Sequence, residues 1–217
     1  IYTGEDTLSL HDALPIFNLR SGILIADNAR LLGQLDVGVF HLSGCLRSGS
    51  VNLHDPFAPS RFVRCDFQDP FVIDSNQADS EVWFDAMSAE RFGLLGGDCT
   101  NLVNPLSNGF GPMLRRTTSN VDAFAAVRSN APLSVEIAQA VADNQVIGVG
   151  YPERTTGQIL LVWPSGTQIP SRPAGGAGTY YRDDADGKAS LAPPAGSQRL
   201  FDCDGSICAV GLSYKQS

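Results

Sequence analysis

The sequence contains few of the residues on which several large classes of protein depend. Lysine occurs only at Lys188 and Lys215, and the formal net charge at pH 7 is -8. A nucleic-acid-binding protein needs a basic face, so this balance argues against that class. No apolar run reaches the length of a membrane span, and no cysteine or histidine spacing is typical of zinc. We therefore expect no nucleic-acid partner, metal or cofactor, and membrane contact only through a missing N-terminal segment.

The first 16 residues, IYTGEDTLSLHDALPI, do not look like the start of a folded domain. No basic residue precedes an apolar run, as it does in a signal peptide. Back-translated in one frame, the stretch resembles a common sequencing adaptor with a variable index. We interpret residues 1–16 as an adaptor-derived artefact and assign no part of the fold to them. We accordingly expect a chain that is truncated at its N-terminus, before Phe17.

The five cysteines predict disulfide bonding. Cys203 and Cys208 flank the sequence DGS, which predicts a hairpin turn between two short strands, and a disulfide across this hairpin is geometrically feasible. Cys45 and Cys65 are candidates for a further pair, which leaves Cys99 as an odd and reactive thiol. The alternative is five reduced cysteines in a cytosolic protein. We favour the bridged form and expect a periplasmic or extracellular location.

The apolar pattern predicts a loop-rich α+β fold. Short strands broken by proline are expected within residues 17–75. Three helices are expected, over 80–92, within 117–129 and over 133–145. Two apolar strands, 146–151 and 157–163, are expected to pair in an antiparallel sheet that packs against two or three of these short helices.

No low-complexity linker marks a domain boundary in this pattern. The predicted organisation is a β-rich segment over 17–78 followed by an α+β domain over 79–217. A single continuous domain over 17–217 is the alternative.

Cys99 is the main candidate for chemistry. The sequence Gly-Gly-Asp-Cys predicts a loop that leads into a helix, and a thiolate at a helix N-terminus is favoured by the helix dipole. The segments GDCTNLVN (97–104), SNVDAF (119–124), AQAVADNQVIGVGY (138–151) and GQILLVWPSG (157–166) resemble the papain-like peptidoglycan amidases. These include the NlpC/P60 and CHAP groups and the amidase effectors of type VI secretion.

This resemblance implies that Cys99 is the nucleophile and that the family's catalytic histidine position is occupied by Gln158. Glutamine cannot act as a general base, and no histidine follows Cys99 in the chain. A permuted arrangement would take the base from outside the motif, from His41 or His54. We expect a catalytically impaired or wall-binding domain whose partner is peptidoglycan peptide; if the domain is active, it is a cysteine amidase or peptidase.

The alternative function is structural. The segment DNARLLGQLDVGVFHLSGC (27–45) resembles the end of the long helix in minor type IV pilins of the PilW kind. This resemblance implies an exported, disulfide-bearing, β-rich protein that assembles with other protein subunits. The two interpretations differ at the cysteines. A pilin should have Cys45 after a helix, whereas an amidase should have Cys99 at the start of a helix packed against strands 146–151 and 157–163.

Overall fold

The computed structural model describes residues 17–77, 80–100, 104–108, 111–131, 134–138, 145–183, 186–191 and 197–213. The chain divides into two compact units, residues 1–109 (unit 1) and residues 110–217 (unit 2). The boundary expected from the sequence, near residue 78, falls inside the first unit. Among the described residues, no helix has the length and hydropathy that a membrane span requires.

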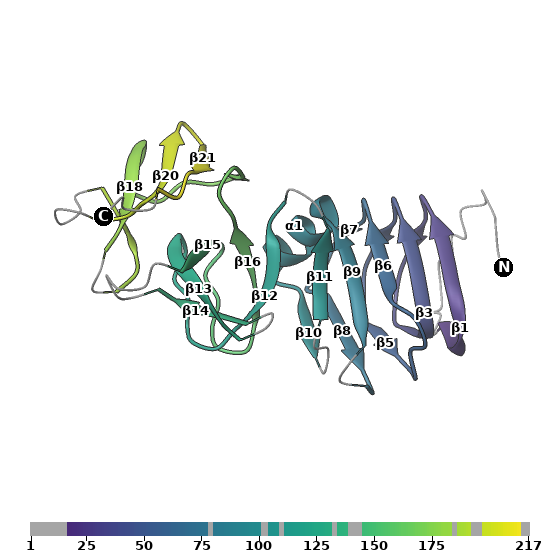
Figure 1. Cartoon of the computed structure of the whole chain (residues 1–217). Helices are drawn as coiled ribbons and strands as arrows, with labels where there is room; N and C mark the ends of the chain where they lie inside the picture. The colour runs from purple at the N-terminus through teal and green to yellow at the C-terminus, as the bar shows by residue number, and fades with distance from the viewer. Residues whose placement is uncertain are drawn as a thin grey trace. The chain divides into compact units, whose positions relative to one another are not determined.

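Unit 1 is a parallel β-solenoid (Figure 1). Each strand pairing among its described residues is parallel, and the strand order of the main sheet, β10-β8-β5-β3-β6-β9-β11, shows that the chain winds in successive coils. β1 pairs with β3, and β2, β4 and β7 form a second sheet. The strands are β1 (Phe17–Asp27) and β2 (Arg30–Leu31) in coil 1, β3 (Leu35–Ser43) and β4 (Leu46–Arg47) in coil 2, β5 (Val51–Leu53), β6 (Ser60–Val63) and β7 (Asp66–Phe67) in coil 3, β8 (Val72–Ser75) and β9 (Glu81–Asp85) in coil 4, and β10 (Asp98–Thr100) and β11 (Asn104–Asn108) in coil 5.

The interior of the solenoid is filled by columns of apolar side chains from consecutive coils. Leu35, Val51, Ile73 and Cys99 pair in register and are all buried. A cluster of phenylalanines fills the same interior, with ring centroids 4.5 to 6.4 Å apart. Its members are Phe40, Phe62, Phe67, Phe71, Phe84 and Phe92. A single coil cannot bury the apolar inner side chains of its own strands. Stacking one coil on the next buries these side chains together and so forms the core of unit 1.

One helix, α1 (Ala86–Leu95), completes coil 4. It begins at Asp85, whose side chain accepts a hydrogen bond from the backbone N–H of Ser88 at 2.9 Å. It ends at Gly96, which has a left-handed φ of 85° and donates its N–H to Gly93 O. The glycines that precede Cys99 therefore end a helix and do not introduce one.

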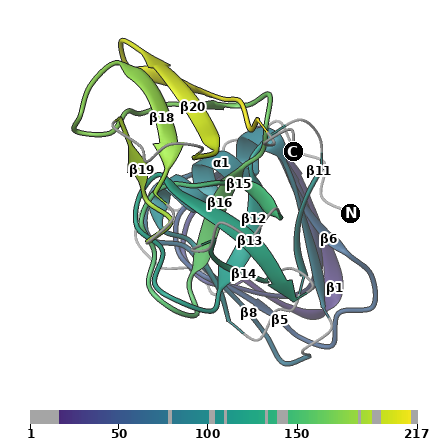
Figure 2. The ribbon, with the colours of Figure 1, turned by 60° about the vertical axis from the view of Figure 1, so that its left-hand side comes forward.

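Unit 2 contains a closed β-barrel and a five-stranded sheet (Figure 2). The barrel strands are β12 (Met113–Thr117), β13 (Ala125–Ala131), β14 (Ser134–Ile137), β15 (Val146–Gly150) and β16 (Ile159–Trp163). Aliphatic side chains that include Val127, Val135 and Leu160 fill the barrel. The sheet strands are β17 (Gln168–Ile169), β18 (Gly178–Arg182), β19 (Ala189–Ser190), β20 (Arg199–Asp204) and β21 (Ile207–Val210).

Two local predictions are confirmed in unit 2. Cys203 and Cys208 lie opposite each other on the β20–β21 hairpin and form a disulfide. The strands expected at 146–151 and 157–163 are β15 and β16, and they pair in antiparallel fashion. Both pairings join residues that are close in sequence, which is why the local pattern was sufficient to predict them.

The predicted α+β fold class is wrong, because the described structure is mostly β and contains a single helix, α1. The helix expected over 80–92 is β9 followed by α1, and the segment 117–129 contributes to β12 and β13. The helix expected over 133–145 begins as strand β14, and its residues 139–144 lie outside the described residues. Closure of the barrel overrides helix propensity here, since Ala125, Ala126 and Val127 are all buried on a strand.

Candidate functional site

Cys99, the expected nucleophile, is a core residue of the solenoid. It lies on β10, opposite Ile73 of β8, and its side chain is fully buried. Its backbone N–H donates to Asp98 Oδ1 at 2.8 Å. A thiol in an apolar column has neither the helix N-terminus nor the solvent access that characterises reactive cysteines. The position is accounted for by packing alone.

The other predicted site residues lie on other elements of the two units. Gln158 belongs to unit 2, where it directly precedes β16 and its Oε1 accepts a hydrogen bond from Thr155 N at 3.0 Å. His41 belongs to unit 1 and is exposed on β3, whereas Cys99 is enclosed in the interior. His54 lies after β5, with its Nε2 3.8 Å from Asp36 Oδ1. Among the described residues of unit 1, the exposed His41 and the enclosed Cys99 are therefore not brought together.

His41 instead belongs to a row of polar and aromatic side chains on the outside of the solenoid. His41 of β3 lies opposite Arg61 of β6, and Arg61 lies opposite Trp83 of β9. The residues on either side of Arg61 and Trp83 in their strands, such as Phe62 of β6 and Phe84 of β9, are buried. Because side chains alternate between the two faces of a strand, His41, Arg61 and Trp83 point outward together. We call these three residues the exterior row.

The spacing of the exterior row is set by the backbone. Adjacent strands of a sheet lie about 4.8 Å apart, so the row presents one side chain per coil along a straight line. His41 and Arg61 are exposed and Trp83 is half-buried. The Trp83 indole N–H donates to Glu81 Oε2 at 3.3 Å on the same strand, which orients the ring. The row thus offers a ring face, a guanidinium and an imidazole to a ligand that runs across the strands.

A second polar cluster lies at the other end of β3. Asp36 Oδ1 accepts hydrogen bonds from Gln34 Nε2 at 3.1 Å and Asn52 Nδ2 at 2.9 Å. Burial raises the pKa of Asp36, but these hydrogen bonds and the nearby charges of His54 and Arg20 outweigh burial and lower the pKa below its ordinary value. This cluster ties coil 2 to coil 3 and therefore serves the fold.

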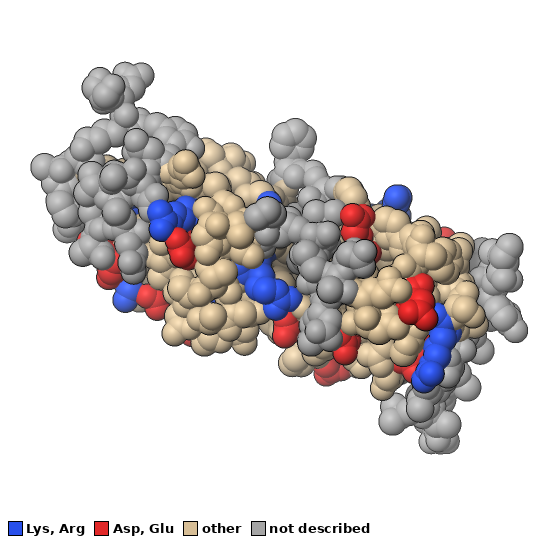
Figure 3. Space-filling view, turned by 60° about the horizontal axis from the view of Figure 1, so that its bottom comes forward, with Lys and Arg blue, Asp and Glu red and all other residues tan. Residues whose placement is uncertain are grey.

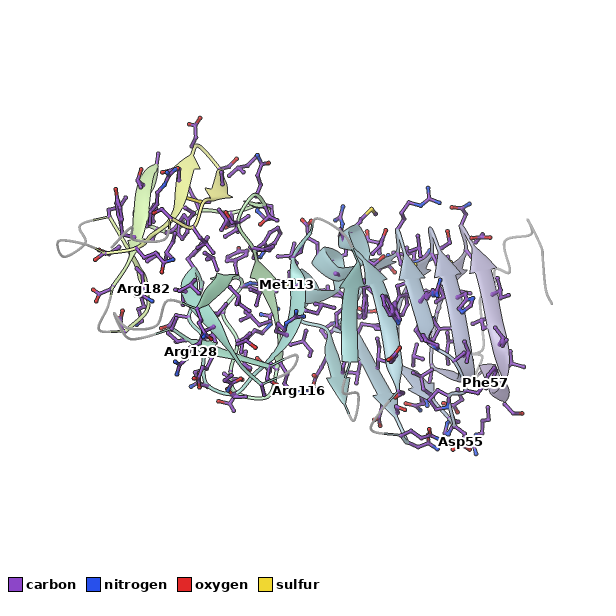
Figure 4. The ribbon with its side chains drawn as sticks, viewed as in Figure 1. Asp55, Phe57, Met113, Arg116, Arg128 and Arg182 are labelled. Atoms are coloured by element: carbon purple, nitrogen blue, oxygen red, sulfur yellow. A yellow bond between two sulfur atoms is a disulfide. The ribbon has the colours of Figure 1, made fainter. Side chains whose placement is uncertain are left out.

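The loop between β5 and β6 exposes an aromatic ring beside this cluster. Phe57 is 61% exposed, and a Cβ added to Gly38 would lie 3.3 Å from its ring. Figure 4 shows Phe57 and Asp55 at the same edge of the unit. Asp55 Oδ1 accepts a hydrogen bond from Asn76 Nδ2 at 3.0 Å, which holds the start of this loop. The loop leaves Phe57 available as a second apolar contact on the exterior.

Sequence reasoning named His41 only as a candidate base and missed Arg61 and Trp83 as its neighbours. The signal lies in the register, since these residues recur at intervals of about 20 residues, one per coil. Coils of unequal length hide such a recurrence from inspection of the sequence. Only the pairing of the parallel strands brings the three positions together.

The charged surface is mixed in sign. In Figure 3, acidic and basic side chains are interspersed on the visible face. This distribution does not favour a polyanionic ligand. No family model matches the chain, and no curated protein matches it.

Proposed function

We propose that the chain is an exported binding protein whose exterior row holds the glycan strand of the bacterial cell wall. The observation that carries the proposal is the alignment of His41, Arg61 and Trp83 in one line across consecutive coils. A binding role is favoured over amide hydrolysis because the Cys99 thiol is enclosed in the apolar interior.

The chemistry of the exterior row suits a chain of neutral sugars. An indole packs against the apolar face of a sugar ring, and guanidinium and imidazole groups donate hydrogen bonds to hydroxyl oxygens. The interval of about 4.8 Å between strands is comparable with the length of one ring in an extended glycan. Each coil can therefore contact one successive sugar.

The exported location rests on the disulfide. The Cys203–Cys208 bond is of the kind that persists in oxidising compartments. A binding protein in such a compartment has direct access to the wall, which is the ligand that this proposal assigns.

Sedimentation with purified peptidoglycan sacculi tests the proposal. We expect the wild-type protein to sediment with sacculi and W83A and R61A to remain largely in the supernatant, because each removes one contact of the row. V72A removes an exposed side chain from β8, outside the row, and is the matched control. Wild-type protein that stays in the supernatant, or W83A that sediments like wild type, would refute the proposal.

Competition then separates the two components of the wall. Soluble chitooligosaccharides should release the protein from sacculi, whereas stem peptides should not, since the exterior row is assigned to sugar rings. Release by stem peptides alone would assign the site to the peptide component.

A structural subunit is the second candidate function, and one observation favours it. Among the described strands, β1 pairs only with β3, and Ile23 and Ile25 of β1 are about half exposed. An open strand edge with apolar side chains is a template for a strand of another copy of the chain. Size-exclusion chromatography with light scattering should then show concentration-dependent dimers that I25K abolishes. A monomer at all concentrations would exclude this candidate.

A further inference from the structure

Cys45 and Cys65 occupy equivalent positions on consecutive coils of the solenoid. Cys45 directly precedes β4 and Cys65 directly precedes β7, and these strands pair with Leu46 opposite Asp66. The backbone N–H of Asp66 donates to Cys45 O at 2.9 Å. Neighbouring strands lie about 4.8 Å apart, a separation within the Cα–Cα range of disulfides. The two cysteines are thus aligned by the fold itself.

The two thiols contact each other in the solenoid interior. Both residues are buried, at 1% and 0% exposure, both are free thiols in the structure, and they lie close enough to shift each other's pKa. Cys45 Sγ also lies 3.4 Å from Ala26 O, and Cys65 Sγ lies 3.2 Å from Leu42 O. The Cys65 thiol therefore leans toward the coil that carries Cys45.

A buried cation lies beside this pair. Arg47 is 0% exposed and donates to Leu31 O at 2.7 Å and to Gly33 O at 3.0 Å. Burial lowers its pKa to about 10, so the guanidinium stays charged at neutral pH, and it interacts electrostatically with both sulfur atoms. The hydrogen bond with Cys65 lowers the pKa of Cys45 to about 7 against the opposing effect of burial, and the same bond raises the pKa of Cys65.

We propose that Cys45 and Cys65 form a disulfide between coils 2 and 3 when the chain folds in the presence of a disulfide oxidant such as oxidised glutathione. One of the two cysteines attacks, as its thiolate, one sulfur of the oxidant and releases one glutathione thiolate, which leaves a mixed disulfide. The thiolate of the other cysteine then attacks the protein sulfur of this mixed disulfide and releases the second glutathione. The protein loses two protons and two electrons, and one oxidised glutathione becomes two reduced molecules.

The same oxidising environment accounts for the Cys203–Cys208 bond of unit 2. The inter-coil bond closes as the coils stack, because the folded interior encloses both sulfur atoms. It fixes the register of coil 3 on coil 2 and removes freedom from the unfolded chain, which stabilises the folded solenoid.

Peptide mapping of the whole chain tests this proposal directly. The reduced protein is refolded in a mixture of reduced and oxidised glutathione, its remaining thiols are blocked with N-ethylmaleimide in denaturant, and it is digested with trypsin. Arginines separate the three cysteines of unit 1 into the peptides 31–47, 65–91 and 92–115. We expect 31–47 and 65–91 to be joined in one species that dithiothreitol separates, with 92–115 carrying the maleimide on Cys99. Separate, maleimide-labelled 31–47 and 65–91 would overturn the proposal, as would the same result for protein produced in a bacterial periplasm.

Stability measurements add a second readout. Oxidation should raise the melting temperature of the wild-type protein by about 5 °C or more. The C45S and C65S variants should lose this rise, and each should label on its remaining partner. C99S replaces a buried cysteine of another coil and should keep the rise. An equal rise in C45S and wild type would show that the gain comes from elsewhere and would overturn the assignment.

Discussion

Asn52 Nδ2 donates a hydrogen bond of 2.9 Å to Asp36 Oδ1 and so joins two consecutive coils of the solenoid. The two residues lie opposite each other in the register of β3 and β5. A pair of this kind is satisfied only when the parallel strands are aligned, because a slip of one residue would turn the side chains to opposite faces. The polar pair therefore specifies the register that the apolar columns stabilise.

The charge of Asp36 makes the stability of unit 1 sensitive to acid. Its pKa is lower in the folded state than its ordinary value of 3.8, so its contribution is fully present above that value and is lost as pH falls through the folded pKa. We expect the free energy of unfolding to fall less steeply from pH 5 to pH 2 in D36N than in wild type. Urea unfolding at a series of pH values measures how the free energy of unfolding depends on pH. The control variant D27N alters an exposed carboxylate of the same unit and should keep the wild-type pH dependence. A wild-type pH dependence in D36N would contradict the role of the Asp36 charge.

Phe62 holds the centre of the aromatic cluster. Its ring centroid lies 4.5 Å from Phe40, 5.2 Å from Phe67 and 5.2 Å from Phe84. F62A should lower the free energy of unfolding by about 3–5 kcal/mol, because it removes a fully buried ring and leaves a cavity. F57A removes a ring that is 61% exposed and should change stability by less than about 0.5 kcal/mol. Equal effects of the two variants in urea unfolding would show that the cluster is not the core of unit 1.

The sequence predicted the short-range pairings and missed the long-range ones. The β20–β21 hairpin and the β15–β16 pair each have a recognisable turn or a nearby partner. The solenoid joins residues that lie about 20 positions apart, such as Arg61 and Trp83, in coils of unequal length. Strand β13 looked helical because Ala125 and Ala126 have high helix propensity, and only the barrel that buries them makes the strand the better choice.

The helix predicted to begin at Cys99 is absent, because glycines can either precede or end a helix. Gly96 adopts φ 85°, and Gly97 donates its N–H to Phe92 O at 2.9 Å, so both belong to the end of α1. Cys99 then lies in strand β10, where its side chain joins an apolar column. His41 was singled out as a candidate base because histidines are few, whereas its place beside Arg61 and Trp83 depends on a register that the sequence alone did not reveal.

Asp85 makes two hydrogen bonds at the start of α1, and the two can be separated by mutation. Its Oδ1 accepts from Ser88 N at 2.9 Å and its Oδ2 accepts from Arg64 N at 3.0 Å. D85A removes both and should destabilise unit 1 by about 1–2 kcal/mol. D85N retains one carbonyl acceptor and should fall between D85A and wild type. Chemical denaturation gives the order, and a D85N variant as unstable as D85A would show that the carboxylate charge matters more than the number of acceptors.

Gly148 of β15 allows the barrel strands of unit 2 to approach closely. A Cβ at this position would lie 2.6 Å from Trp163 O and 2.7 Å from Val162 Cγ1, and the backbone carbonyl cannot move aside without breaking the barrel. G148A should therefore lower the stability of unit 2 by about 1–3 kcal/mol. G211A is the matched control, because the nearest atom to its new Cβ is 3.9 Å away, on the Arg199 side chain. The melting temperatures of the two variants are compared by thermal unfolding. Equal melting temperatures of G148A and G211A would contradict the prediction that the close approach of β15 and β16 requires glycine at position 148.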